Sequence, residues 1–204
     1  MGYIYTVEFY EVIRKRRVRR HFVDTEIPRE VVDRIVWAIG RAPSAGYTQG
    51  NRILVIHSKS AREKFWEYCS TENWPSSNPP SLRFASLLII FFENEAAYRS
   101  RYSLEDKANV LQRTDGDFVA PYWTIDAAFM AMIAQLSAIE EDLDYLFFGI
   151  HQGIERLISE FDVPEGLKAI GAIAVGRSLA IESGSASRLE KIQLNKLTLG
   201  EKYY

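Results

Sequence analysis

The sequence predicts an α+β domain in which helices flank a small sheet of mixed or antiparallel strands. Three observations favour this fold class. Short apolar runs with strand character occur at 52–57, 84–92 and 169–175, far apart in the chain. Apolar residues at helical spacing occupy much of the chain between these runs. No repeat and no linker separates two cores, so we expect one domain over 1–204.

The first 69 residues predict three helices and one strand. Phe9, Val12 and Ile13 share one helical face. Pro28 suits the first turn of a second helix, where its missing N–H is not needed, and Gly40 ends that helix. In chain order the expected elements are a helix over 7–15, a helix from 28 to 40, a loop over 42–51, a strand over 52–57 and a helix over 58–69.

The remaining residues predict two strands, three helices and a long tail. The run at 84–92 is almost wholly apolar, as in a strand covered on both faces. The helix over 121–141 is apolar nearly all round, which predicts burial on several sides, including against a second subunit. The leucines of the polar tail need a surface to lie on, so we expect a C-terminal extension that reaches across a dimer. The other expected elements are a loop over 70–81, a helix over 104–111, an apolar segment over 145–149, a helix over 154–161, a strand over 169–175 and the tail over 177–204.

Composition and charge exclude several classes of protein. A net charge of −2 argues against a chain that coats nucleic acid or an anionic membrane. Cys69 is the single cysteine, and the three histidines are too widely spaced to indicate a metal site. Asp126 and Gln135 interrupt the best candidate for a membrane span, 122–139, and the N-terminus lacks the pattern of a signal peptide. We therefore expect a soluble cytoplasmic protein without a bound metal.

Six of the seven residues from Arg14 to Arg20 are basic. Such a run has three interpretations: a solvated charge cluster, a nucleic-acid-binding patch, or a site for a compact anion that accepts paired bonds from guanidinium groups. The run alone does not decide between them. The acidic balance of the chain and the lack of aromatic residues inside the run make nucleic acid the least supported partner.

The surroundings of this run carry a longer pattern. Residues 16–22 read RRVRRHF, residues 24–28 read DTEIP, and a predicted helix leads from there to APSAGYTQ at 42–49. In order and spacing these segments resemble the nitroreductase family, which opens with Arg-Arg-Ser-x-Arg-x-Phe, a D-x-x-[IV]-P turn and an A-P-S-x-x-N-x-Q-P-W loop. The family's central helix with its glycine-bearing turn, its closing strand and its late arginine segment resemble 122–150, 163–177 and 185–192.

The resemblance implies a site for FMN in the interface of a homodimer. Arg16, Arg20 and the distant Arg188 would hold the phosphate and the N1/O2 edge of the ring, while the backbone N–H of Gly149 would lie near N5. The loop at 42–49 of the second subunit would border the isoalloxazine. The cofactor-binding residues that the resemblance implies are Arg16, Arg17, Val18, Arg20, Pro43, Ser44, Tyr47, Gln49, Phe148, Gly149 and Arg188.

The chain departs from the family pattern at four of these motif positions. Val18 replaces the hydroxyl residue, which removes one ligand contact. Tyr47 replaces the asparagine whose amide would pair with the pyrimidine edge of the flavin, and a tyrosine hydroxyl cannot copy a two-sided amide bond. Gly50 and Asn51 replace proline and tryptophan. We expect these changes to alter the detailed geometry and the substrate rather than abolish flavin binding.

The resemblance implies an oxidoreductase in which NADH or NADPH delivers hydride to flavin N5. A small electron acceptor, such as a nitroaromatic compound or a quinone, then takes the hydride in a ping-pong order. The cofactor carries the chemistry, so no catalytic side chain is expected. Consistent with this, the sequence has no Ser–His–Asp arrangement and no G-x-G-x-x-G after a strand. A non-enzymatic flavin- or small-ligand-binding protein is the alternative that the departures at Val18 and Tyr47 leave open.

Overall fold

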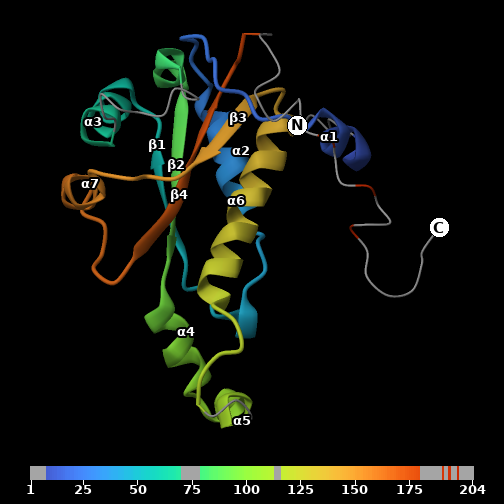
Figure 1. Cartoon of the computed structure of the whole chain (residues 1–204), viewed down its shortest axis with the longest axis vertical. Helices are drawn as coiled ribbons and strands as arrows, with labels where there is room; N and C mark the ends of the chain where they lie inside the picture. Colours follow the sequence, from blue (N-terminus) through green and yellow to red (C-terminus); the bar gives the residue numbers. More distant parts are fainter. Residues whose placement is uncertain are drawn as a thin grey trace.

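A four-stranded antiparallel sheet separates two layers of helices (Figure 1). The computed structural model describes residues 8–69, 79–112 and 116–179, with the single residues 190, 193 and 197 beyond them. The strand order is β1-β2-β4-β3, and each pair of neighbours is antiparallel. The α+β class is therefore confirmed, with a purely antiparallel sheet. The strands are β1 (Arg52–Ile56), β2 (Leu87–Glu93), β3 (Asp144–Phe148) and β4 (Lys168–Gly176).

The helices follow the predicted order with one addition. They are α1 (Phe9–Lys15), α2 (Arg29–Ile39), α3 (Lys59–Cys69), α4 (Glu95–Tyr102), α5 (Glu105–Gln112), α6 (Tyr122–Glu140) and α7 (Ile154–Glu160), with 3₁₀ turns at Ala45–Tyr47 and Pro80–Phe84. The sequence did not predict α4, which Asn94 caps by accepting a hydrogen bond from the Ala97 N–H at 3.1 Å. Residues Pro80–Phe84 form a 3₁₀ turn, so β2 begins at Leu87 rather than at residue 84.

The strand β2 forms the centre of the core, and all seven of its residues are buried. Successive side chains of a strand point to opposite faces of the sheet. Leu88, Ile90 and Phe92 therefore pack with apolar side chains of α3 and α7. The odd-numbered residues between them pack with α2 and α6 on the other face. This arrangement explains the uninterrupted apolar run, because both faces of the strand are covered by helices.

One face of α6 is left partly exposed in the described part of the chain. In the part of the chain that the structure describes, α6 alone would suit a membrane span by length and composition. Its alanines, however, pack against the sheet and α2, as in the core helix of a layered domain. Phe129 and Met132 lie on the other side and are each 45% exposed. The burial of this side of α6, including against a second subunit, therefore stays a prediction.

The C-terminal segment begins beside the N-terminal one. The Leu179 N–H donates to the His21 carbonyl and the Val23 N–H donates to the Arg177 carbonyl, both at 3.0 Å. Apart from the single residues 190, 193 and 197, the predicted tail beyond residue 179 lies outside the described residues. Arg188 and the expected crossing of a dimer fall in that part, and 70–78 of the predicted loop also lie outside it.

Candidate functional site

The residues 16–20, which we call the basic segment, run beside the first residues of β3. Val18 forms a parallel bridge with Tyr145, and the Arg19 N–H donates to the Tyr145 carbonyl at 2.9 Å. The Arg16 guanidinium donates to the Tyr145 hydroxyl at 3.3 Å. The short helix α1 leads into this segment near the C-terminal end of α6 (Figure 1). Backbone pairing with β3 therefore fixes where these arginines lie.

The basic segment holds positive charge that the described residues do not neutralise. Arg19 lies 3.7 Å from the Asp144 carboxylate, and Arg17 donates to backbone carbonyls. Among the described residues no carboxylate pairs with Arg16 or Arg20. The Arg20 Nε is buried and has no hydrogen-bond partner there. The Arg19 Nε is likewise buried without a hydrogen-bond partner there. Because buried donors in folded proteins are normally paired, these atoms are donors that the phosphate or the N1/O2 edge of FMN would satisfy.

Phe148 and Gly149 lie at the end of β3, further along the same strand. The Phe148 ring stacks on Trp66 with centroids 6.0 Å apart and meets Phe65 edge-on, so this side chain belongs to the core. A ligand can reach only the backbone here. Gly149 is exposed, and a Cβ built on it would meet nothing closer than the His151 ring at 3.4 Å. The backbone at Gly149 is therefore open to the close approach of a flat ring.

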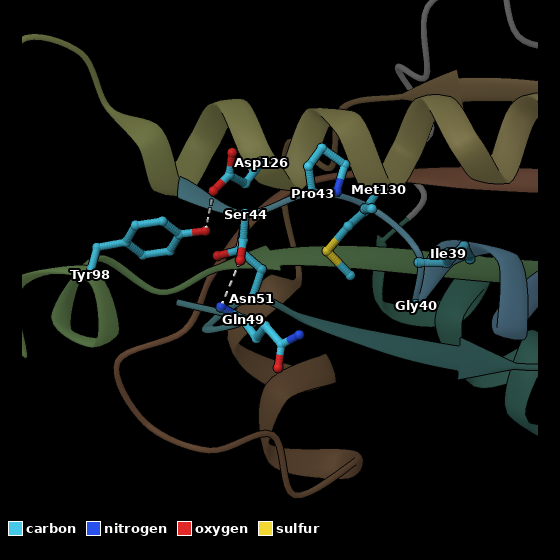
Figure 2. Close-up of a pocket in the computed structure, with 10 residues that line it drawn as sticks. Ile39, Gly40, Pro43, Ser44, Gln49, Asn51, Tyr98, Asp126 and Met130 are labelled. Atoms are coloured by element: carbon cyan, nitrogen blue, oxygen red, sulfur yellow. Dashed lines mark hydrogen bonds between the residues drawn. The ribbon is translucent and has the colours of Figure 1, made fainter. Parts of the chain in front are cut away.

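The residues 43–49, which we call the 43–49 loop, are held by hydrogen bonds from several directions. The Ala45 N–H donates to Asp126 of α6 at 2.7 Å. The Gln49 N–H donates to the Ser44 hydroxyl at 3.0 Å (Figure 2). Arg101 of α4 donates to a loop carbonyl at 2.9 Å. The loop is thus pinned to α4, to α6 and to itself, which makes it rigid.

Three residues of the 43–49 loop occupy the left-handed region of the backbone. Gly46 has φ 61°, Tyr47 has φ 54° and Gln49 has φ 51°. This conformation is uncommon for residues other than glycine, and it persists where surrounding contacts enforce it. Tyr47 is 78% exposed, although its backbone is fixed. The loop therefore presents an aromatic side chain away from its own chain.

A pocket of about 230 Å³ lies between the 43–49 loop and α6 (Figure 2). Pro43, Ser44 and Gln49 of the predicted site residues line it, whereas Tyr47 does not. The lining also includes residues that the sequence did not single out as functional, namely Ile39, Gly40, Ala42, Asn51, Tyr98, Asp126 and Met130. The sequence does mark Asp126, because a carboxylate inside an apolar helix is unusual.

The buried polar groups around this pocket are tightly bonded to one another. Tyr98 donates to Asp126 at 2.6 Å, while the Asn51 amide donates to the Trp123 carbonyl at 2.8 Å and accepts from the Asn94 N–H at 3.1 Å. Burial, followed by the bond to Asp126, raises the pKa of the Tyr98 hydroxyl well above its usual range. Tyr98 therefore stays protonated and acts as a donor.

Within one chain the basic segment and the 43–49 loop lie at opposite ends of α6 (Figure 1). The loop is bonded near the first turns of this helix, and the basic segment lies beside β3, which follows its last turn. A helix of 19 residues rises about 28 Å. Among the described residues, the structure therefore holds Arg16, Arg17 and Arg20 in one segment and the predicted loop residues in another, but it does not bring the two sets together within one chain.

Other reactive side chains give no competing site. Among the described residues no group of histidine, cysteine, aspartate and glutamate could hold a metal ion. Cys69 is buried, and burial raises the pKa of its thiol to about 12. A thiol in that state is not a nucleophile at neutral pH.

The layered fold and the arginines beside β3 define the class of protein, an α+β protein with the nitroreductase fold. The sequence model of the Nitroreductase family matches residues 13–177. The chain therefore belongs to the nitroreductase family, and this membership supports an oxidoreductase.

Relatives and solved structures agree with this assignment. An NADPH-dependent oxidoreductase of Staphylococcus aureus (strain bovine RF122 / ET3-1) is 24% identical over 182 residues, which are 87% of this chain and 67% of that protein. Iodotyrosine deiodinase 1 of Sus scrofa is 32% identical over 65 residues, a match that spans 32% of this chain but only 22% of the relative's length. The crystal structure of an Exiguobacterium sibiricum protein, described as a nitroreductase in complex with FMN, has a TM-score of 0.70 at 16% identity. That match covers 96% of this chain and 98% of the other, and at this identity it shows the fold.

Proposed function

We propose that this chain is an FMN-dependent oxidoreductase that works as a cytoplasmic homodimer. It would transfer hydride from NADH or NADPH to a small electron acceptor such as a nitroaromatic compound or a quinone. The observation that carries the proposal is the buried, unpaired Nε of Arg20 beside the exposed Arg16, in a chain of the nitroreductase family. The complex of the Exiguobacterium sibiricum protein with FMN and the name of the Staphylococcus aureus relative support the cofactor and the reductant.

The residues of the basic segment would bind and orient the cofactor. Arg16 and Arg20 would hold the phosphate and the N1/O2 edge through charge-assisted hydrogen bonds, and Arg188 would add a third cation. Arg20 would also stabilise negative charge at that edge, since a fixed cation needs no reorganisation during the reaction. The backbone N–H of Gly149 would face N5. When bound, FMN would supply the hydride chemistry, with reductant and acceptor using the same face in ping-pong order.

The separation of the two halves of the site supports a homodimer. A two-fold axis that crosses α6 would set each copy's 43–49 loop against the other copy's basic segment, because an isologous interface pairs the same surface with itself. The face that would be buried is apolar. Phe129 and Met132 of α6 are exposed, as are Phe9, Tyr10 and Ile13 of the neighbouring α1, and large exposed apolar side chains are typical of an interface.

The spectrum of the purified protein tests this function. The protein should be yellow, and NADH or NADPH should bleach the flavin absorption in the absence of oxygen. Adding a quinone or a nitroaromatic compound should then restore the absorption. A protein that binds flavin but is not reduced by either nucleotide would be a non-enzymatic flavin carrier, which is the alternative function. A colourless protein that fails to bind added FMN would refute both.

A further inference from the structure

A second pocket, of about 240 Å³, lies where α4 and α5 extend beyond the end of the sheet (Figure 1). We call it the arm pocket. Its walls come from both helices, from the residues that lead into α6 and from the edge of the 43–49 loop. No lining residue is one that the proposed flavin site uses, so flavin binding does not explain this pocket. The lining residues are Ala45, Tyr102, Val110, Leu111, Asp117, Phe118, Val119 and Tyr122.

Tyr102 brings an unpaired hydroxyl group to the arm pocket. This residue is 8% exposed, and in the described part of the chain its hydroxyl forms no hydrogen bond. A Cβ built on Gly46 would lie 3.1 Å from the hydroxyl oxygen, so the group lies at the edge of the pocket that Ala45 forms. Buried polar groups normally have a partner, and leaving one without a partner costs free energy. A ligand atom that accepts a hydrogen bond would satisfy this hydroxyl.

The chemistry of the lining favours a neutral ligand. Burial, followed by the neighbouring Tyr122, raises the pKa of the Tyr102 hydroxyl above its ordinary value of 10. The group therefore keeps its proton and can donate to an oxygen atom such as that of a carbonyl group. Asp117 is the one charged residue of the lining, and its carboxylate lies 3.5 Å from the Arg99 guanidinium. A charged ligand would disturb this ion pair, whereas a neutral one would not.

The walls of the arm pocket are aromatic. Phe118 meets Tyr102 edge-on with ring centroids 5.0 Å apart, and it meets Tyr122 in the same way at 6.1 Å. Val110 and Val119 add aliphatic surface. Aromatic rings pack well against another ring in offset or edge-to-face geometry. The lining therefore favours an aromatic ring over an aliphatic one.

The size of the arm pocket limits the ligand to one ring. An apolar cavity of about 150 Å³ holds benzene, while drug-sized ligands occupy about 300–1,000 Å³. The arm pocket, with about 240 Å³, lies between these limits. It therefore has room for a single ring with one small substituent.

We propose that the arm pocket binds a neutral, single-ring aromatic carbonyl compound. The ring would pack against Phe118 and Tyr122, and the carbonyl oxygen would accept a hydrogen bond from the Tyr102 hydroxyl. The site does not depend on the proposed function. It is formed by the cavity, its aromatic walls and its one unpaired, buried hydroxyl group.

A titration of the full-length protein, as purified, tests this site. Amide resonances of Ala45 and Val119 are followed by NMR while acetophenone, ethylbenzene, cyclohexyl methyl ketone or benzoate is added. We expect saturable shifts with acetophenone. Ethylbenzene lacks the oxygen and should bind about fivefold more weakly, the ratio expected for one neutral hydrogen bond. Cyclohexyl methyl ketone lacks the aromatic ring and should also bind more weakly, and benzoate should give no shifts. Equal binding of acetophenone and ethylbenzene, or shifts that never saturate, would overturn the proposal.

The same titration with excess FMN present separates the arm pocket from the proposed flavin site. The affinity for acetophenone should not fall, and FMN should stay bound, because the two sites share no residue. Displacement of FMN by acetophenone, or loss of the shifts, would place the ligand in the flavin site and contradict the proposal. If the protein binds no FMN, the proposed function fails, while the first titration still decides whether the arm pocket binds its ligand.

Substitutions separate the hydroxyl from the rest of the pocket. Tyr102→Phe keeps the ring and should lower the affinity for acetophenone about fivefold, to that of ethylbenzene, whose own affinity should not change. Tyr68→Phe removes a hydroxyl from α3, on the opposite face of the sheet, and should leave both affinities unchanged. Val110→Trp narrows the pocket from a partly exposed position and should weaken both ligands. Unchanged acetophenone binding in Tyr102→Phe or in Val110→Trp would contradict the assignment.

Discussion

The basic segment and the 43–49 loop lie at opposite ends of α6 and are built in opposite ways. The basic segment is fixed by backbone pairing to β3, while Arg16 and Arg20 lack carboxylate partners among the described residues. The loop is held by bonds to Asp126 and Arg101, and it accepts backbone strain to present Tyr47. The arginines of the basic segment lack carboxylate partners among the described residues, whereas the loop is held by hydrogen bonds from several elements.

Under the proposed function, this difference assigns different roles to the two regions. The basic segment would bind the ligand through arginines that lack carboxylate partners, and the strained loop would form a rigid wall beside it. Substitutions in the two regions should therefore fail in different ways. Changes in the basic segment should weaken binding without unfolding the chain, and changes in the loop should lower both stability and activity.

The largest expected effect is on flavin affinity in the variant Arg16→Gln/Arg20→Gln. Each guanidinium contributes charge-assisted bonds, so the Kd for FMN should rise by at least about 100-fold. The melting temperature of the apoprotein should hardly change, because neither side chain pairs with a carboxylate in the described structure. Flavin fluorescence titration gives the Kd. Arg29→Gln, an exposed arginine on α2, is the matched control and should bind FMN like the wild type.

The next effect comes from Gly46→Val in the loop. A Cβ at this position would lie 2.8 Å from the Tyr102 ring, and its φ of 61° disfavours a β-branched residue. We expect a loss of about 1–3 kcal/mol in the free energy of unfolding, measured by urea denaturation. The turnover with NADH and a quinone should fall about tenfold if the loop borders the cofactor.

A second glycine separates backbone strain from the site. Gly166 has φ 80° in a turn, and a Cβ there would meet nothing within 4 Å. Gly166→Val should therefore lower the free energy of unfolding through backbone strain, as Gly46→Val does, while turnover stays at the wild-type level. Loss of turnover in Gly166→Val equal to that in Gly46→Val would show that the loop has no special role.

A smaller effect is expected for Tyr47→Asn. The ring is 78% exposed, so its removal breaks no buried contact, and asparagine tolerates the left-handed backbone better than tyrosine. The melting temperature should not fall. The Kd for FMN should fall about two- to tenfold, because the asparagine amide restores the two-sided bond that the family motif implies, and one hydrogen bond usually contributes that much. Tyr47→Phe keeps the ring and should leave the Kd unchanged; a drop in affinity there would assign the effect to the hydroxyl.

The smallest effect concerns the ion pair between Arg101 of α4 and Asp106 of α5. Arg101 binds Asp106 with two bonds of 2.7 Å and also donates to the loop backbone. The bond to Arg101 lowers the pKa of the Asp106 carboxyl below its ordinary value of 3.8. The stabilisation is therefore present above pH 3.8 and is lost as the pH falls through the lowered value. The melting temperature of Asp106→Asn should lie slightly below that of the wild type at pH 7, and the difference should shrink as the pH falls below 3.8.

The sequence predicted the fold class and most elements, because periodic apolar patterns are strong where elements are long or fully buried. The helices α2 and α6 and the strand β1 lie within a few residues of their predicted bounds. The short helix α4 was missed because it is polar and carries little periodicity. Its signal was local, the capping Asn94 followed by the Glu95–Arg99 pair.

The candidate site was less accessible to sequence reasoning. The resemblance to the nitroreductase family identified the arginines and the loop, but where each side chain packs depends on tertiary contacts. Phe148 turns into the core to stack on Trp66, which no local pattern encodes. Asp126 was noted only as an interruption of an apolar helix, and its bonds to Tyr98 and the loop come from residues far away in the chain. The assembly of a pocket from distant residues is a property of the fold rather than of any segment.

Subunit complementation tests most directly whether the basic segment and the 43–49 loop meet across two copies of the chain. The variants Arg16→Gln/Arg20→Gln and Gly46→Val are purified, mixed in equal amounts and allowed to exchange subunits. Each mixed dimer should then contain one intact site, so activity should rise to about a quarter of the wild-type value, above that of either variant alone. Activity that stays at the average of the two separate variants after verified exchange would contradict the account.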